Sequence, residues 1–324
     1  MDYGEAVQIL HKGILGTNSI DQIAFVVNDI DQAISSFSKL LGISQPEWFL
    51  TGAHDRSRVF YKGEPSDTQS KLVFIDTPSV QIELMEVNDE PSTMKDYLNA
   101  NGEGIHHLAL VVDKIAPCLE PLAKSSYPLL QSGEFTSVNK GRYAYLDTEA
   151  SLKTVFELLE RETLQPKKVG DLIDEPLFSS RTFTQIALVV EDIYSSAARF
   201  RDLLNLEIPS KIESGTPVAS QVTFKGEVTE VDAVFMSFKT PTIEVELIQP
   251  GERPSIWKDH LEKYGEGIHH ISLELDNLEE RLPGFQKKGY DVIQQGKDWK
   301  GQYAYLDTKE EFKVVIKLLE RQSH

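Results

Sequence analysis

Two adjacent histidines occur twice in this chain, each time inside the hexapeptide GEGIHH, at residues 102–107 and 265–270. Imidazole nitrogens are common ligands of divalent metals, so a pair of histidines could begin a metal site. The same six residues could also be two copies of the start of a strand, with no chemistry. The polar residues elsewhere in the chain decide between these two interpretations.

Four polar side chains interrupt segments that are otherwise apolar. Gln22 begins QIAFVV and His107 is the second residue of HHLALVV, while Glu83 lies within VQIELMEV and Glu157 within TVFELLER. Together they supply three oxygens and one imidazole nitrogen, which suits a divalent ion such as Zn, Mn, Co or Ni. A single histidine or glutamate in a strand is more often structural or solvent-facing, so the hypothesis depends on where the four residues lie relative to one another.

An internal duplication shows that their positions are equivalent. DQIAFVVNDIDQAISSFSKLLGI (21–43) matches TQIALVVEDIYSSAARFRDLLNLEI (184–208), and GRYAYLDT (141–148) matches GQYAYLDT (301–308). Gln22 and Gln185, Glu83 and Glu246, and His107 and His270 are each separated by 163 residues. The chain therefore contains two copies of one sequence, and we looked for the elements within each copy.

Hydrophobic periodicity predicts the same order of elements twice within each copy. QIAFVV is predicted to be a strand and DQAISSFSKLLG a helix that begins near Asp29 and ends at Gly42, followed by the strands RVFYKG, KLVFID and VQIELMEV. HHLALVV, the helix VDKIAPCLEPLAKSS and the strands LLQSGEF, RYAYLDT and TVFELLER repeat that order. The predicted fold class is α+β, with four βαβββ units in two tandem pairs.

The predicted boundaries follow from this repeat. Residues 1–17 form an N-terminal extension, 18–161 the first domain and 183–324 the second domain. Residues 162–182, ETLQPKKVGDLIDEPLFSSRT, are polar and contain two prolines, so they are predicted to form a linker. Gln22 and His107 then each begin the first strand of a unit, while Glu83 and Glu157 lie in the last strands. If two units pair about a pseudo-twofold axis, the four side chains converge in one cleft.

The composition excludes several classes of function. A net charge of −18 argues against a nucleic-acid partner, which would require a basic surface. No segment approaches the roughly 20 apolar residues of a membrane helix, and the N-terminus does not resemble a leader, so we expect a cytoplasmic protein with no membrane partner. A single cysteine, Cys118, rules out an intramolecular disulfide. Either a monomer or a homodimer is compatible with the sequence.

The segments around these residues resemble the vicinal oxygen chelate superfamily, which includes glyoxalase I, methylmalonyl-CoA epimerase, extradiol dioxygenases and bleomycin-resistance proteins. The resemblance rests on IDQIAFVVNDIDQAISSFSKLLGI, IELM, GEGIHHLALVVD and FELLE, and it covers nearly all of both repeats. It implies that each pair of units forms a cupped mixed sheet around a cleft. It also implies that Gln22, Glu83, His107 and Glu157 are metal ligands, a set similar to that of eukaryotic glyoxalase I.

The second copy departs from this pattern. Its equivalents are Gln185, Glu246, His270 and Lys317, where Lys317 stands in the place of Glu157. A charged ammonium cannot bind a metal, so we expect Lys317 to pair with Glu246 and to replace the ion with a salt bridge. The expectation is one competent and one degenerate site. The sequence leaves open whether each site forms within a repeat or whether Gln185 and Glu246 join His107 and Glu157 across the repeats.

The resemblance implies a metal-dependent enzyme that transfers a proton next to a carbonyl through a metal-stabilised enolate, as an isomerase, epimerase or glyoxalase-type lyase. Glu157 is the first candidate for the base and Glu83 the second. Gln22 and Gln185 break the two-His, one-Glu triad of the extradiol dioxygenases. The alternative is a metal-free protein that binds or sequesters a small molecule, as bleomycin-resistance proteins do.

The predicted substrate is a small carbonyl compound, and an anionic tail is one option. Two groups of residues could receive such a tail: Lys140 and Arg142 with Tyr143 and Tyr145, or Arg56, Arg58 and Lys62. His106 precedes the candidate ligand His107, and strand alternation predicts that it faces the opposite way as a structural residue or as a support for the ligand.

Overall fold

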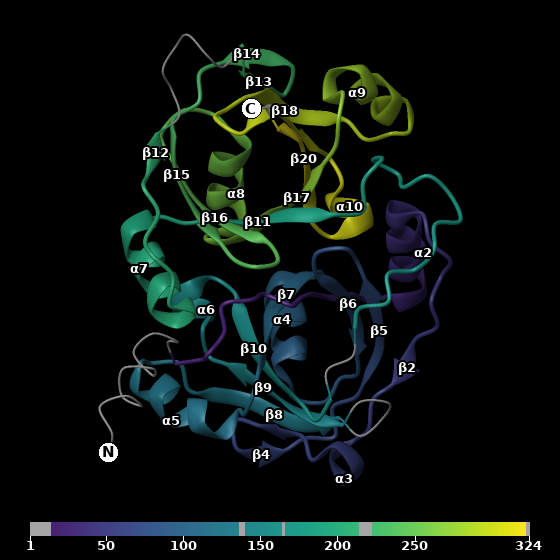
Figure 1. Cartoon of the computed structure of the whole chain (residues 1–324), viewed down its shortest axis with the longest axis vertical. Helices are drawn as coiled ribbons and strands as arrows, with labels where there is room; N and C mark the ends of the chain where they lie inside the picture. Colours follow the sequence, from purple (N-terminus) through teal and green to yellow (C-terminus); the bar gives the residue numbers. More distant parts are fainter. Residues whose placement is uncertain (1–13, 136–139, 164–165, 214–221, 322–324) are drawn as a thin grey trace.

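The structure is a computed structural model that describes residues 14–135, 140–163, 166–213 and 222–321. Within these residues each repeat forms one curled sheet of ten strands, so the α+β prediction of two tandem cupped sheets is confirmed. Figure 1 shows the two curled sheets one above the other, each wrapped around a helix. We call the concave side of each sheet the cup of that repeat.

The elements of the first repeat follow in chain order. The strands are β1 (Gln22–Val26), β2 (Phe49–Leu50), β3 (Phe60–Tyr61), β4 (Glu64–Pro65), β5 (Ser70–Asp76), β6 (Gln81–Val87), β7 (Gly104–Val112), β8 (Leu129–Phe135), β9 (Gly141–Leu146) and β10 (Val155–Arg161). The helices are α2 (Ile30–Leu41), α3 (His54–Ser57), α4 (Thr93–Asn101), α5 (Ala116–Lys124) and α6 (Glu149–Leu152).

The second repeat contains matching elements. Its strands are β11 (Phe183–Val189), β12 (Ile212–Glu213), β13 (Val222–Phe224), β14 (Glu227–Thr229), β15 (Ala233–Lys239), β16 (Glu244–Pro250), β17 (Gly267–Glu274), β18 (Val292–Lys297), β19 (Gly301–Leu306) and β20 (Val315–Arg321). Its helices are α7 (Ile193–Leu204), α8 (Ile256–Tyr264), α9 (Leu278–Lys287) and α10 (Lys309–Phe312). None of the helices in the described ranges is long and apolar enough to cross a membrane.

The sheet order of the first repeat is β2-β5-β6-β1-β7-β10-β9-β8-β3-β4. The first strands of the two units, β1 and β7, pair antiparallel at its centre, and each pairs in parallel with the last strand of its own unit, β6 or β10. The centre of the sheet is thus built from the four strands that carry the candidate ligands. TVFELLER, which has helical propensity, is strand β10, as predicted.

The segment RVFYKG was predicted to be a strand, and the structure forms one there over a shorter stretch. Only Phe60–Tyr61 forms a strand there, and β3 pairs with β8 of the second unit instead of with β5. The hairpin β3–β4 therefore covers the outer edge of the neighbouring unit, which a local pattern of alternating residues does not reveal. Strand β13 pairs with β18 in the same way in the second repeat.

Helix α2 illustrates how the sequence sets the helix ends. The Asp29 carboxylate accepts a hydrogen bond from the Gln32 backbone N–H (2.9 Å), and Gly42 ends the helix in the left-handed region with a φ of 67°. A Cβ at Gly42 would also lie 2.4 Å from the Asp174 carbonyl oxygen, so the linker can pack here only against glycine. Residues 162–182 are more than a spacer, because Phe178 is completely buried.

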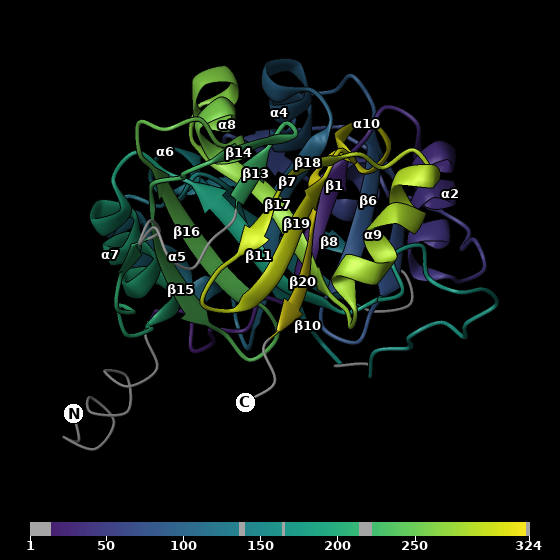
Figure 2. The same cartoon turned by 90° about the horizontal axis from the view of Figure 1, so that it is seen from above.

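One hydrophobic core joins the two repeats. It contains the convex sides of both sheets and the buried faces of α2 and α7. Helix α2 packs on α10 and α7 packs on α6, and Figures 1 and 2 show these helices between the sheets and at their margins. Two salt bridges at equivalent positions join the two repeats, Lys153–Glu266 (2.6 Å) and Lys313–Glu103 (3.0 Å). The repeats are thus related by an approximate twofold arrangement.

Candidate metal centre

Glu83 and His107 lie in one row across the centre of the first sheet. Ala24 of β1 is opposite Glu83 in the parallel pair with β6 and opposite His107 in the antiparallel pair with β7. Residues opposite each other in a sheet project from the same face. Glu83 and His107 therefore flank Ala24, whose small side chain leaves the space between them open.

Gln22 and Glu157 lie in the adjacent row on the same face. Ala109 is opposite Gln22 in the pair with β1 and opposite Glu157 in the pair with β10. Since positions two apart on a strand project from the same face, all four predicted ligands project into the cup of the first repeat. Each repeat builds its own cup, which excludes the arrangement in which Gln185 and Glu246 would join His107.

The two histidines of GEGIHH lie on the same face, so the prediction that His106 faces away from His107 was wrong. In the pairing of β1 with β7, Ala24 is opposite His107 but Phe25 is opposite Ile105, which leaves His106 as the extra residue of a β-bulge. The bulge interrupts the alternation of side chains. His106 Nδ1 consequently lies 2.9 Å from His107 Nδ1.

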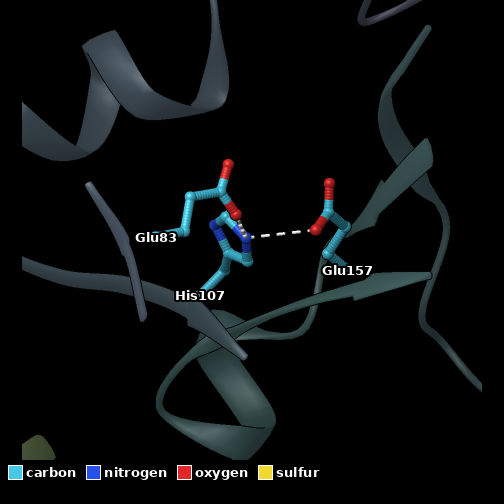
Figure 3. A group of neighbouring side chains, drawn as sticks. All are labelled: Glu83, His107 and Glu157. Atoms are coloured by element: carbon cyan, nitrogen blue, oxygen red, sulfur yellow. Dashed lines mark ion pairs between the residues drawn. The ribbon is translucent and has the colours of Figure 1, made fainter. Parts of the chain in front are cut away.

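Glu83, His107 and Glu157 form a compact, buried cluster (Figure 3). His107 Nε2 lies 3.2 Å from Glu157 Oε2 and 3.6 Å from Glu83 Oε2. One ligand atom from each residue lies within 4.8 Å of the other two. In Figure 3 the dashed lines from both carboxylates end at the same nitrogen of the imidazole. Three side chains from three strands therefore present donor atoms to a common point.

Several polar atoms at this centre have no hydrogen-bond partner among the described residues. They are Gln22 Oε1, His107 Nε2 and Glu157 Oε2, each in a residue that is at most 4% exposed. The other end of the Gln22 amide donates to Gln81, which fixes the amide orientation and leaves the oxygen free. Burial without a partner costs free energy, and of these atoms His107 Nε2 and Glu157 Oε2 face each other in an ion pair at 3.2 Å. The donor set fits a divalent cation.

The pKa shifts within the cluster also indicate a place that favours a positive charge. Burial by itself lowers the pKa of His107, but the carboxylates of Glu157 and Glu83 outweigh it and raise that pKa to about 9. Burial likewise raises the pKa of the Glu83 carboxyl above its ordinary value, against the lowering effect of His107. The two carboxylates thus favour a positive charge between them.

Aromatic and apolar side chains surround the cluster. The Tyr145 ring lies 4.9 Å from the His107 ring and 5.7 Å from the His106 ring, and the Tyr143 ring follows at 5.4 Å from Tyr145. Burial raises the pKa of the Tyr145 phenol well above its ordinary value, so the hydroxyl remains a hydrogen-bond donor. Charges act more strongly in such surroundings than in water.

The basic residues considered for an anionic tail are paired with acids at the surface. Arg142 lies 3.5 Å and Arg58 3.9 Å from different oxygens of Glu134, and Lys62 lies 3.2 Å from Asp96. Arg56 pairs with its neighbour Asp55 (3.9 Å), and Lys140 is exposed. Of the residues considered for the tail, only Tyr143 and Tyr145 lie in the ring cluster around His107.

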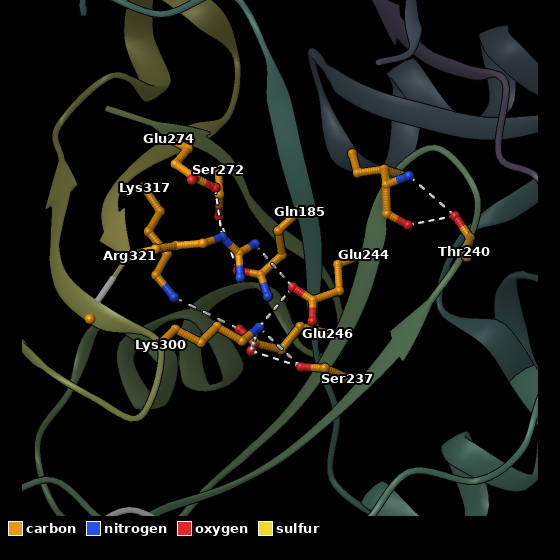
Figure 4. Close-up of polar contacts among 12 residues, drawn as sticks. Gln185, Ser237, Thr240, Glu244, Glu246, Ser272, Glu274, Lys300, Lys317 and Arg321 are labelled. Atoms are coloured by element: carbon orange, nitrogen blue, oxygen red, sulfur yellow. Dashed lines mark hydrogen bonds and ion pairs between the residues drawn. The ribbon is translucent and has the colours of Figure 1, made fainter. Parts of the chain in front are cut away.

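The equivalent place in the second cup holds cations of the chain itself (Figure 4). Lys317 Nζ lies 4.0 Å from Glu246, which is the predicted ion pair. Lys300 Nζ is closer, at 2.9 Å from Glu246 and 3.1 Å from Glu244, and it was not predicted. Its sequence equivalent in the first repeat, Lys140, is exposed. A lysine at this position therefore does not by itself predict an ion pair inside the cup.

The other two predicted residues of the second cup occupy the expected rows. Gln185 accepts a hydrogen bond from Ser272 (3.1 Å), and His270 repeats the bulge with His269 at 2.8 Å between Nδ1 atoms. Large side chains fill the remaining space. Trp257 replaces Met94 and donates to the Tyr305 hydroxyl (3.3 Å). The second cup is therefore packed and internally neutralised by Lys300 and Lys317, although Glu246 Oε2 and His270 Nε2 also lack a hydrogen-bond partner there.

Comparison with known proteins agrees with this fold. The chain belongs to the Glyoxalase/Bleomycin resistance protein/Dioxygenase superfamily, whose profile matches residues 21–145 and 184–305. The resemblance to vicinal oxygen chelate proteins is thereby confirmed. Members of this superfamily include enzymes that act on small molecules with a divalent metal, which agrees with the candidate site in the first repeat.

The individual relatives are distant. An uncharacterized protein of Bacillus subtilis (strain 168), YqjC, is 23% identical over 143 residues, which is 44% of this chain and 92% of that protein. A triple mutant of 4-hydroxymandelate synthase from Streptomyces coelicolor matches 95% of this chain and 94% of its own, with a TM-score of 0.60 and 13% identity. Methylmalonyl-CoA epimerase from Mycobacterium tuberculosis matches 45% of this chain and 91% of its own, with a TM-score of 0.34 and 14% identity. At 13% identity the match to the 4-hydroxymandelate synthase mutant shows the fold alone.

Proposed function

We propose that the first repeat is a metal-dependent enzyme that transfers a proton on a carbon next to a carbonyl, as an isomerase, epimerase or glyoxalase-type lyase. The second repeat then serves as its structural partner, with a degenerate site. The observation that carries the proposal is the buried cluster of Glu83, His107 and Glu157, whose ligand atoms lie within 4.8 Å of one another. Gln22, Glu83, His107 and Glu157 would hold one divalent ion, of the Zn, Mn, Co or Ni type.

A bound divalent ion would supply positive charge where negative charge develops on the carbonyl oxygen. The ligand set has one imidazole nitrogen. Non-haem iron oxygenases use two histidines and one carboxylate, so this set supports proton transfer over oxygen chemistry. His106 Nδ1 lies within hydrogen-bond distance of His107 Nδ1, and burial keeps the pKa of His106 well below its usual range. Neutral His106 can accept the Nδ1 proton of His107, which leaves His107 Nε2 free to bind an ion.

Glu157 is our candidate for the base. Its Oε2 atom is buried, and it lies 3.2 Å from His107 Nε2. A carboxylate in this place can take the proton from the substrate carbon and return it to the neighbouring carbon, whereas an epimerisation would need a second group to deliver a proton to the opposite face. The protonated Tyr145 phenol beside it can donate a hydrogen bond to the reacting group. Glu83, on the other side of His107, is the second candidate.

The change Glu157→Gln tests the assignment of the base. It keeps the size of the side chain and an oxygen ligand but removes the proton acceptor, so we expect proton transfer to fall by about 100- to 10,000-fold. The measurement is exchange of substrate protons for solvent deuterium by NMR, across a panel of small 2-oxo acids and acyl thioesters. Glu160→Gln on the same strand is the control, because Glu160 instead pairs with Lys114 (2.8 Å). An exchange rate in Glu157→Gln equal to that of the wild type rejects Glu157 as the base.

A metal-free binding protein is the second candidate function, and one observation favours it. His107 lies close enough to Glu157 to neutralise it as an imidazolium, so the cluster can exist without a metal. Purified protein that contains no metal, takes up none and exchanges no substrate protons would support this candidate and contradict the enzyme.

A further prediction concerns the bulged histidine. His106→Phe removes the acceptor of the His107 proton while preserving an aromatic ring, so we expect metal affinity to fall by roughly 10- to 100-fold. Competition with a chelating dye measures the affinity. The matched control is His269→Phe in the second repeat, which should leave the affinity unchanged. If both variants bind metal as the wild type does, His106 has only a packing role.

A further inference from the structure

Two aromatic rings are exposed side by side in the first repeat. Phe49 of β2 is 40% exposed and Phe74 of β5 is 42% exposed, and their ring centroids are 6.1 Å apart. Single exposed apolar residues are common on protein surfaces. Two exposed rings in contact with each other and close to polar donor atoms are not explained by chance exposure. The position of the pair on the sheet shows what it adjoins.

Both rings belong to the cup that contains the candidate metal centre. Phe74 is directly opposite Glu83 in the pairing of β5 with β6, and Phe49 is opposite Leu72 in the pairing with β2. Leu72 is buried in the apolar cluster of this cup, whereas Val73 belongs to the core on the other side of the sheet. Phe74 therefore projects from the same face as Glu83, one strand nearer the sheet edge.

The second cup lacks this pair. Ser237 stands in the place of Phe74 and donates a hydrogen bond to Glu246 (3.1 Å), so it completes the internal charge network. Ile212 stands in the place of Phe49 and packs against the apolar cluster of the second cup. Among the described residues, the exposed aromatic pair thus lies in the repeat that contains the cluster of Glu83, His107 and Glu157, whereas the cup with Ser237 and Ile212 is neutralised by lysines.

We propose that Phe49 and Phe74 form a subsite for a flat apolar group of the substrate, such as an aryl ring, attached to the carbonyl that reacts at the centre. The inference rests on the proposed function and specifies its substrate class. The ring of Phe74 adjoins Glu83, so a substrate whose polar end reaches the centre extends its body over the pair. Stacking on aromatic rings favours such a group over a methyl group by roughly tenfold.

Two chelating probes that differ only in this group provide the test. Benzohydroxamate and acetohydroxamate bind metals through the same two oxygens, and titration calorimetry on the metal-loaded full chain gives both affinities. We expect the wild type to prefer benzohydroxamate by about tenfold or more. The variants Phe74→Ser and Phe49→Ile copy the second repeat, and in the double variant the preference should fall to about twofold or less, with acetohydroxamate still bound.

The outcomes separate the subsite from the proposed function. If metal and acetohydroxamate bind but the preference for benzohydroxamate survives in the double variant, the subsite is wrong and the proposed function stands. If the wild type binds neither metal nor probe, the proposed function fails and the subsite fails with it. If the double variant turns a wild-type dimer into a monomer without changing the preference, a second copy of the chain covers the rings and the subsite is overturned.

Discussion

Replacing His107 by alanine is expected to remove the bound divalent metal, from about one ion per chain in the wild type to a small fraction of that. His107 supplies the single nitrogen of the donor set, and its loss leaves Glu83 and Glu157 in a cup where the cation no longer has a ligand between them. The measurement is metal content by mass spectrometry after loading with Zn, Mn, Co or Ni and exhaustive dialysis. We expect affinity to fall by at least about 100-fold.

The duplication supplies a matched control for this experiment. His270→Ala makes the same change in the same motif, but Lys300 and Lys317 already neutralise Glu246 in the second cup. This variant should keep about one ion per chain. Two ions in the wild type, or loss of metal in His270→Ala alone, would contradict the assignment of the centre to the first repeat.

Lys300→Met is expected to lower the free energy of unfolding by about 3 kcal/mol, a larger loss than we expect for any of the other substitutions. The side chain is nearly buried and is the closest cation to Glu244 and Glu246, of which Glu246 is completely buried. Removing one partner of a buried pair leaves the other charge uncompensated. Urea denaturation of the full chain gives the free energies of unfolding.

Lys140→Met is the control, because Lys140 occupies the same place in the first repeat but is exposed. Its effect should remain within about 0.5 kcal/mol. Equal stabilities for the two variants would show that Lys300 is not needed to compensate the buried carboxylates.

The pH dependence of stability follows from the same network. Burial alone would raise the pKa of Glu246, but the ammonium groups of Lys317 and Lys300 outweigh it and lower that pKa below its ordinary value. The stabilisation is therefore present above the ordinary pKa of about 4.3 and is lost as the pH falls through the lowered value. In Lys300→Met the same loss should begin at a higher pH, because one of the two lowering charges is gone.

Much of the fold and the position of the candidate site could be predicted from the sequence. The constant offset between Gln22 and Gln185 and between His107 and His270 shows the repeat directly. Gln22, Glu83, His107 and Glu157 then converge because they occupy equivalent strands, and the four strands pair at the centre of one sheet. The repeat indicates which strands are equivalent, whereas their order and register in the sheet are shown by the structure.

The remaining features depend on three-dimensional contacts that no local pattern encodes. The bulge at His106 adds one residue to β7 without changing the apolar pattern, so alternation predicted the wrong face. Lys300 and Lys140 precede the same glycine and tyrosine motif, yet packing buries one and exposes the other. Helix α4 was missed because it is short and only Met94 and Thr93 are buried, although Ser92 caps it in the usual way.

The hairpin β3–β4 has a consequence for synthesis of the chain. Phe60 pairs with Ser132, which lies 72 residues later in the chain. The ribosome must therefore synthesise the second unit up to this strand before the first unit can form all of its strand pairs. Until then the hairpin and its backbone groups lack their partner strand, and contacts this distant in sequence form slowly. A pair of units is therefore the smallest piece of this chain in which the described strands of a sheet have their partners, and the shared core then joins the two pairs.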